Sequence, residues 1–228
     1  SVSGDYVLIA PTHSGNTNIS VSGSLSVVEL PTSEGNHVTL SAGTDLAVVV
    51  PLNVGIGTVT LSAGGGLSLG DKVTADTLNV TTGGNLNLTS DVDNLNATIR
   101  NGGDLVIQQI GDIEIDSLDM SGGDVTIIAT GAVTIKNFTG FGGKVTIIAD
   151  KGIVLNNTAH LDSLTLNAKN GGVSGNINTS TLNLNATGTI NLVIQGAVVV
   201  EQLATTTGAI SLQSSGDMTV NSTDVAGG

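Results

Sequence analysis

The residues whose types and spacing are best suited to chemistry are carboxylates that alternate along one short stretch. Asp112, Glu114 and Asp116 are separated from each other by Ile113 and Ile115. In an extended strand this alternation places the three carboxylates on one face and the isoleucines on the other. Carboxylates spaced in this way can bind Ca²⁺, or can supply the acid and base of glycoside hydrolysis. We favour the simpler interpretation, a solvated strand face beside an aliphatic core, because exposed carboxylates are the rule in proteins.

Other residue types that carry chemistry are few and scattered along the chain. His13, His37 and His160 do not share one position of the sequence repeat, and the chain has no cysteine, so no zinc site is expected. Arg100 is the single arginine and tryptophan is absent, so few side chains could hold or stack on a sugar. We therefore expect no catalytic residue and no cofactor, and we keep Ca²⁺ at the acidic stretch as an alternative.

Polar residues that alternate with apolar ones raise two further possibilities. Nine Asn-x-Ser/Thr sequences could accept glycans on an exported protein. A chain in which Asn and Thr alternate with apolar residues produces this tripeptide by composition alone, and we favour that interpretation. Thr39, Thr60, Thr126 and Thr146 are expected at comparable strand positions, where a regular threonine row could bind ice. Asn79 interrupts the row, so an ice-binding face is not favoured.

The element that must position all these residues is a repeat, which is clearest between residues 121 and 157. The phrase Gly-Gly-Asp-Val-Thr-Ile-Ile-Ala at 122–129 returns twenty positions later as Gly-Gly-Lys-Val-Thr-Ile-Ile-Ala at 142–149. A second apolar pair follows each copy, so each unit contains two short strands joined by a bend. The predicted core residues of these two units are Val125, Ile127, Val133, Ile135, Val145, Ile147, Ile153 and Leu155.

This period, which persists along the chain, predicts an all-β fold. We expect a single-stranded, right-handed parallel β-helix with about 20 residues per coil and roughly ten to twelve coils. Stacked coils would place Asn85, Asp104, Asp124 and Lys144 above one another. The predicted solenoid covers residues 1–220, and residues 221–228 are expected to form a C-terminal tail or linker. The long gap between Leu182 and the apolar pair that begins at 210 predicts an insertion near residues 197–204.

Proline and glycine are expected at the corners between strands. A proline lacks the N–H that a parallel ladder needs, and a glycine allows a positive φ or a close approach to the next coil. The predicted corner residues are Pro11, Pro31, Pro51, Gly83, Gly102, Gly122 and Gly142.

Composition limits the partners that the chain can have. Six basic residues against 19 acidic ones give a net charge of −13, which disfavours direct binding to nucleic acid or to an anionic membrane. The longest apolar stretch, residues 46–54, is broken by Pro51 and is too short to span a bilayer. The lack of cysteine is compatible with secretion, and no signal-peptide pattern follows Ser1, so a mature or excised form is expected.

The repeated phrase resembles that of a known family of secreted proteins. Residues 59–64 (Val-Thr-Leu-Ser-Ala-Gly) and 182–192 (Leu-Asn-Leu-Asn-Ala-Thr-Gly-Thr-Ile-Asn-Leu) are similar to the stalk repeats of filamentous-haemagglutinin-type large exoproteins, which are adhesins of Gram-negative bacteria. The resemblance covers most of residues 16–220 and implies a right-handed β-helix in an extracellular stalk. The Asn-Pro-Asn motif of that family's amino-terminal secretion domain does not occur in the sequence.

From the residues and the resemblance we expect a non-catalytic, secreted or cell-surface structural and adhesive β-solenoid. Two alternatives stay open: a self-assembling filament or surface-layer subunit, and a β-helical enzyme that acts on polysaccharide. The expected partners are neighbouring copies or further solenoid coils end to end, and host or cell-surface glycans or proteins. Neither nucleic acid nor membrane insertion is expected.

Overall fold

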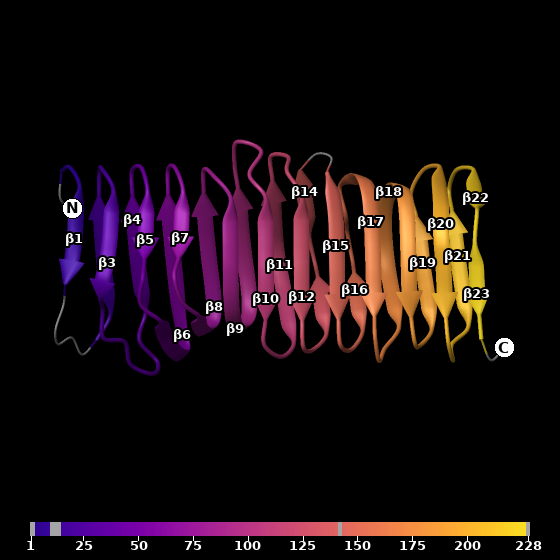
Figure 1. Cartoon of the computed structure of the whole chain (residues 1–228), viewed down its shortest axis with the longest axis horizontal. Coiled ribbons are helices and arrows are strands. Elements are labelled where there is room, and N and C mark those ends of the chain that lie inside the picture. The colour runs from indigo at the N-terminus through magenta and orange to yellow at the C-terminus, as the bar shows by residue number, and fades with distance from the viewer. Residues whose placement is uncertain (1–2, 10–14, 141–142, 227–228) are drawn as a thin grey trace.

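The chain forms a parallel β-solenoid of about 11 turns with about 20 residues per turn. The structure, a computed structural model, describes residues 3–9, 15–140 and 143–226. Successive coils stack along one long axis, with the N-terminal coil at one end and the C-terminal coil at the other (Figure 1). Among the described residues there is no helix that is long and apolar enough to cross a membrane.

The strands are short where a coil turns sharply and long where one strand continues around a corner. In chain order they are β1 (Tyr6–Ile9), β2 (Thr17–Val21), β3 (Leu25–Glu29), β4 (Val38–Ala42), β5 (Leu46–Val48), β6 (Leu52–Ala63), β7 (Leu67–Leu69), β8 (Val73–Thr82), β9 (Leu86–Ile99), β10 (Leu105–Gln109), β11 (Ile113–Met120), β12 (Val125–Ala129), β13 (Val133–Ile135), β14 (Phe138–Gly140), β15 (Lys144–Ala149), β16 (Ile153–Leu155), β17 (His160–Ala168), β18 (Val173–Ala186), β19 (Ile190–Ile194), β20 (Val198–Thr205), β21 (Ile210–Ser214), β22 (Met218–Val220) and β23 (Thr223–Val225).

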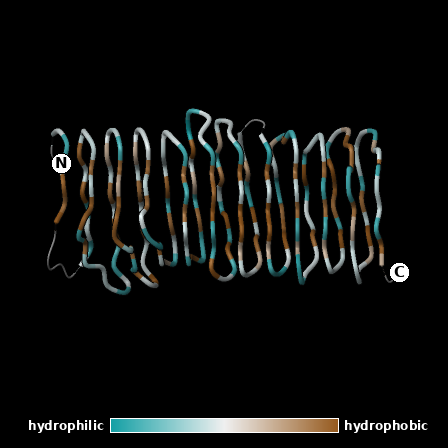
Figure 2. The backbone as a smooth tube through the Cα atoms, in the orientation of Figure 1, coloured by the Kyte–Doolittle hydropathy of each residue, from teal (hydrophilic) through white to brown (hydrophobic). Residues whose placement is uncertain are grey.

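Like positions of successive coils lie in register, as the repeat predicts. Val125 pairs with Val145 and Ile127 with Ile147 between β12 and β15, and all pairings between strands are parallel. The column that contains Val125 and Val145 runs through Leu86, Leu105, Val125, Val145, Leu164, Leu182, Val200 and Val220. The eight predicted core residues are at most 3% exposed and belong to one aliphatic core. Figure 2 shows hydrophobic segments recurring from coil to coil along the solenoid.

The coil that begins at β12 has three strands rather than the expected two. β12 and β13 are followed by β14, in which Phe138 pairs with Leu118 of β11 and is 4% exposed. This third side was missed because β14 is three residues long and has one large apolar residue, so it shows no alternation.

Two expectations about the C-terminal half are wrong. Residues 197–204 contain no inserted loop, because β19 and β21 pair with Ile190 opposite Ile210, the ordinary spacing of twenty residues. The irregularity is limited to β20. Leu182 pairs with Val200 and Asn183 pairs with Gln202, so the pairing skips one residue of β20. The predicted tail contains β23, whose Thr223 pairs with Leu203, so the solenoid continues beyond residue 220.

Glycine is required at the corners for two different reasons. A Cβ built on Gly83 would lie 2.1 Å from the carbonyl oxygen of Gly64 one coil away, so the coils approach too closely for a side chain. Gly102 and Gly122 instead have positive φ angles of 72° and 113°. Pro31 and Pro51 lie in the connections after β3 and β5, outside the strands. Two predicted corner residues, Pro11 and Gly142, lie outside the described residues.

The stacked polar residues at one corner form a hydrogen-bonded ladder. The Asp104 N–H donates to Asn85 Oδ1 (2.9 Å), the Asp124 N–H to Asp104 Oδ1 (2.8 Å) and the Lys144 N–H to Asp124 Oδ1 (2.8 Å). Each side chain therefore satisfies a backbone donor of the next coil that no strand pairing satisfies.

We expect Asp104→Ala to lower the free energy of unfolding by about 0.5–1.5 kcal/mol, because the Asp124 N–H exchanges its side-chain acceptor for water at this exposed corner. Asp104→Asn should keep most of that stability, since a side-chain amide oxygen can accept the same bond and the charge beside Asp124 is removed. Urea denaturation of the two variants measures the difference. Equal losses in both would show that the charge, and not the acceptor, is what matters.

Candidate functional site

The acidic stretch lies where the chain turns from β10 into β11. Ile113 and Ile115 are buried and Glu114 points outward between them, as the alternation predicts. Asp112 and Glu114 line a surface depression of about 400 Å³, together with Asp93, Asn94, Ile113, Ala132 and Thr134. The structure thus brings the predicted carboxylates onto one surface.

Lysines from later coils occupy the space in front of these carboxylates. Lys136 Nζ lies 2.8 Å from Asp116 Oδ1 and also forms an ion pair with Glu114. Lys151, two coils after Asp112, places its Nζ 2.9 Å from Asp112 Oδ1. The same Asp112 oxygen accepts a hydrogen bond of 2.8 Å from the Ala132 N–H. All three predicted carboxylates therefore have cationic partners within the protein.

These contacts fix the charged forms of the groups. The hydrogen bond from Lys151, and then that from the Ala132 N–H, lower the pKa of Asp112 below its ordinary value. Hydrogen bonds to Asp116 and then to Glu114 raise the pKa of Lys136. A general acid at neutral pH needs a carboxyl pKa that is raised, usually by an apolar environment. The pKa of Asp112 is lowered instead of raised, so its environment does not favour a role as general acid.

A Ca²⁺ site at this stretch has no support in the geometry either. Within the described ranges, no group of three or more His, Cys, Asp or Glu side chains is arranged to hold a metal ion. The carboxylates of Glu114 and Asp116 do converge on one point, but the Lys136 ammonium group occupies it. Asp112 is paired with Lys151 instead, so the three carboxylates do not supply the set of converging oxygens that Ca²⁺ requires.

Removing the Lys151 cation should raise the pKa of Asp112. We expect Lys151→Met to move the Asp112 titration toward the ordinary aspartate range, measured by NMR of the carboxyl carbon. Because the folded-state pKa lies below the unfolded one, this contact contributes stability above the unfolded pKa and loses it as the pH falls through the folded pKa. The effect on stability is small because both side chains are more than 60% exposed. An unchanged Asp112 titration in Lys151→Met would contradict the assigned contact.

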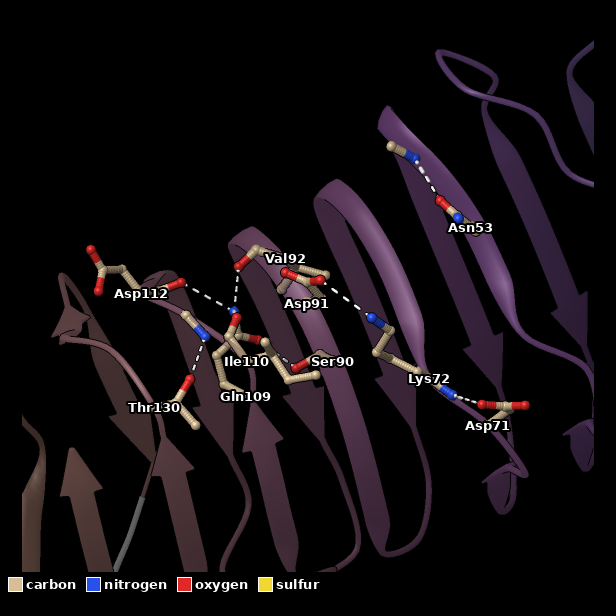
Figure 3. A network of polar contacts seen from close by, with 12 residues as sticks. Asn53, Asp71, Lys72, Ser90, Asp91, Val92, Gln109, Ile110, Asp112 and Thr130 are labelled. Atoms are coloured by element: carbon tan, nitrogen blue, oxygen red, sulfur yellow. Dashed lines mark hydrogen bonds and ion pairs between the residues drawn. The ribbon is translucent and has the colours of Figure 1, made fainter. Parts of the chain in front are cut away.

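One buried polar residue beside this surface was not predicted. Gln109 is 3% exposed, and its Nε2 donates to the carbonyl oxygens of Val92 (2.8 Å), Ile110 (2.9 Å) and Asp112 (3.1 Å). Its Oε1 accepts from Ser90 Oγ at 2.7 Å. Figure 3 shows this network at the bend between β10 and β11. The sequence does contain a signal for this buried residue. Gln109 follows Leu105 and Ile107 in the same alternation, so it occupies an inward position of the strand.

The histidines that the structure describes take part in contacts between coils. His37 Nδ1 accepts a hydrogen bond from the Thr58 N–H at 3.2 Å, and His160 Nδ1 lies 2.9 Å from Asn178 Oδ1. The two residues are in different strands and connections, as the sequence predicts. His13 lies outside the described residues.

The four threonines that were expected at one position belong to two different columns. Thr39 pairs with Thr60 between β4 and β6, and Asn79 continues that column. Thr126 and Thr146 lie on β12 and β15, on another side of the coil. In the first column Asn79 Nδ2 donates to Thr60 Oγ1 at 3.4 Å, so the Thr60 hydroxyl is bonded within the protein.

Comparisons of the chain with models of known protein families, with curated proteins and with solved structures find no match. The fold and the contacts described above therefore carry the functional argument.

Proposed function

We propose that the chain is a non-catalytic structural segment of a secreted or cell-surface protein, in which it serves as a rigid spacer or fibre element. The observation that carries this proposal is the continuous core. The same aliphatic column passes through every coil from Leu86 to Val220 by parallel pairing, without a break at which the rod could bend. Each coil rests only on its neighbours, so length is gained by adding coils.

The outer surface supports the same proposal. Ion pairs link successive coils from the outside, as between Lys72 and Asp91 (3.3 Å) and between Lys169 and Asp150 (2.7 Å). Exposed pairs of this kind contribute little stability individually, but together with the corner ladder they satisfy polar groups along the rod. The resemblance of the repeat phrase to stalk repeats of large exoproteins favours an adhesin stalk, with further coils and cell-surface glycans or proteins as partners.

A second candidate, a self-assembling filament subunit, is favoured by the terminal coils. Tyr6 at one end is 40% exposed, and Met218, Val220 and Val225 at the other are 38%, 42% and 50% exposed, although they continue columns that are buried elsewhere. Such edges also carry backbone groups that can pair with another coil.

Small-angle scattering of the purified chain over a series of concentrations tests both candidates. The spacer proposal predicts a rod about 50 Å long, from about 11 turns at about 4.8 Å each, whose length does not depend on concentration or on a chelator. Growth of the length with concentration would favour the filament instead. Release of reducing sugar from a purified polysaccharide that is lost in Asp116→Asn would contradict a non-catalytic role.

A further inference from the structure

Along one side of the solenoid, two neighbouring rows of outward side chains contain no ionisable group over nine successive coils. We call this surface the neutral face. It consists of the central outward side chains on β3, β5, β7, the first part of β9, β10, β12, β15, and the last parts of β17 and β18. These residues alternate with buried ones in each strand: Ser26, Val28, Ala47, Ser68, Asn87, Thr89, Val106, Gln108, Thr126, Ile128, Thr146, Ile148, Thr165, Asn167, Asn183 and Asn185.

The neutral face is unusual in a chain with 25 charged residues and a net charge of −13. The ion pairs of Lys72, Lys136, Lys151 and Lys169 all involve residues outside it. Charged residues occur at both of its borders. The corner ladder places Asp104, Asp124 and Lys144 along one edge, and Glu29 ends β3 at the other. A neutral centre with a charged border is the usual arrangement of a protein interface.

Apolar side chains are exposed within the neutral face. Val28 is 45% exposed and Ile128 is 40% exposed, and Val49, which directly follows β5, is 55% exposed. Between them lie the hydroxyl and amide groups of Thr and Asn, which can bond across a contact without the cost of desolvating a charge.

The dimensions of the neutral face approach those of a stable contact between proteins. Nine strands at about 4.8 Å and two outward rows, which span about four residues at about 3.3 Å, give roughly 570 Å². A standard interface buries about 800 Å² of each partner.

We propose that a second copy of this chain packs against the neutral face, sheet on sheet, so that two rods lie side by side. Two copies with this net charge repel each other on their acidic sides, and the neutral face is where the repulsion is smallest. A neutral glycan fits this face less well, because none of the outward residues named above is aromatic and sugars are held chiefly by stacking on aromatic rings. The contact is lateral and differs from stacking of the terminal coils.

Sedimentation equilibrium of the full chain tests this proposal with a matched pair of variants. Thr126→Asp introduces a charge at the middle of the neutral face, and Ser174→Asp introduces one at an outward, half-buried position of β18 on another side of the coil. Wild type and Ser174→Asp should form pairs, and Thr126→Asp should weaken pairing at least about tenfold, because like charges face each other across the contact. Thermal unfolding of both variants checks that each is folded.

A cross-linking experiment gives an independent result, since the chain has no cysteine. Thr146→Cys should form a disulfide-linked pair on mild oxidation, and Ser174→Cys should not. The proposal is overturned if the wild type stays single at all concentrations, or if Thr126→Asp and Ser174→Asp reduce pairing equally. Association that occurs only end to end, seen as growth in rod length that Thr126→Asp leaves unchanged, would also overturn it. Binding of the unpaired chain to immobilised dextran would overturn it as well.

Discussion

Replacing Ile127 by aspartate is expected to destabilise the protein by about 4 kcal/mol or more, a large fraction of the stability of most proteins. Ile127 is fully buried in the aliphatic core and pairs with Ile107 and Ile147 in the coils on either side. The substitution removes about 2 kcal/mol of apolar burial and places a carboxylate between the buried side chains of Ile107 and Ile147, which cannot pair with it.

The neighbouring variant Thr126→Asp is the control, because Thr126 is one residue away and points outward on the same strand. We expect it to change the free energy of unfolding by less than about 1 kcal/mol. Urea and thermal unfolding, followed by circular dichroism, compare the two variants. Similar stability of both would contradict the assignment of inward and outward faces.

A glycine-to-alanine change at a corner should have an effect of similar size. A Cβ on Gly64 would lie 2.1 Å from the carbonyl oxygen of Gly43, which belongs to the backbone of the preceding coil and cannot rotate away. To accept the methyl group, two stacked coils must separate and lose their parallel pairing nearby. We expect Gly64→Ala to cost about 3 kcal/mol or more.

Gly66, two residues along the same turn, provides the comparison. A Cβ there would meet Asp45 Oδ1 at 3.5 Å, an ordinary contact with a side chain, so Gly66→Ala should be nearly neutral. The difference between the two unfolding midpoints in urea is the quantity to measure. Equal tolerance of both alanines would mean that the coils do not approach each other at Gly64 as closely as the structure shows.

The sequence predicts most of the fold because a parallel solenoid converts a linear period into vertical contacts. Val125 and Val145 were expected to meet, and they do, since the phrase around them repeats almost unchanged. The prediction failed where an inward position is not aliphatic. In the last coil, Thr223 takes the place in the column that Leu203 occupies one coil earlier. A threonine at this position gives no apolar signal, so β23 was not predicted.

The candidate site was predicted less completely than the fold. Alternation was enough to place Asp112, Glu114 and Asp116 on one surface. Lys136 lies one period of twenty residues after Asp116, so the repeat could have predicted that contact. The contact between Lys151 and Asp112, which are 39 residues apart, could not be predicted in this way. A contact across two coils depends on the reach and direction of a long side chain, which a period does not specify.

The most direct test of the account is the unfolding of a variant that lacks one whole coil, residues 125–144. The deletion joins Asp124 to Val145, and residues 145–149 are identical to the removed residues 125–129. Leu105 should then pair with Val145 as it now pairs with Val125, and every later column should keep its register.

The control removes half a coil, residues 125–134, and moves all later positions out of register. We predict that the twenty-residue deletion unfolds in urea in a cooperative transition, with only a modest loss of stability, and that the ten-residue deletion has no such transition. If removing twenty residues is as damaging as removing ten, the coils are not the repeating unit of this protein, and the account is wrong.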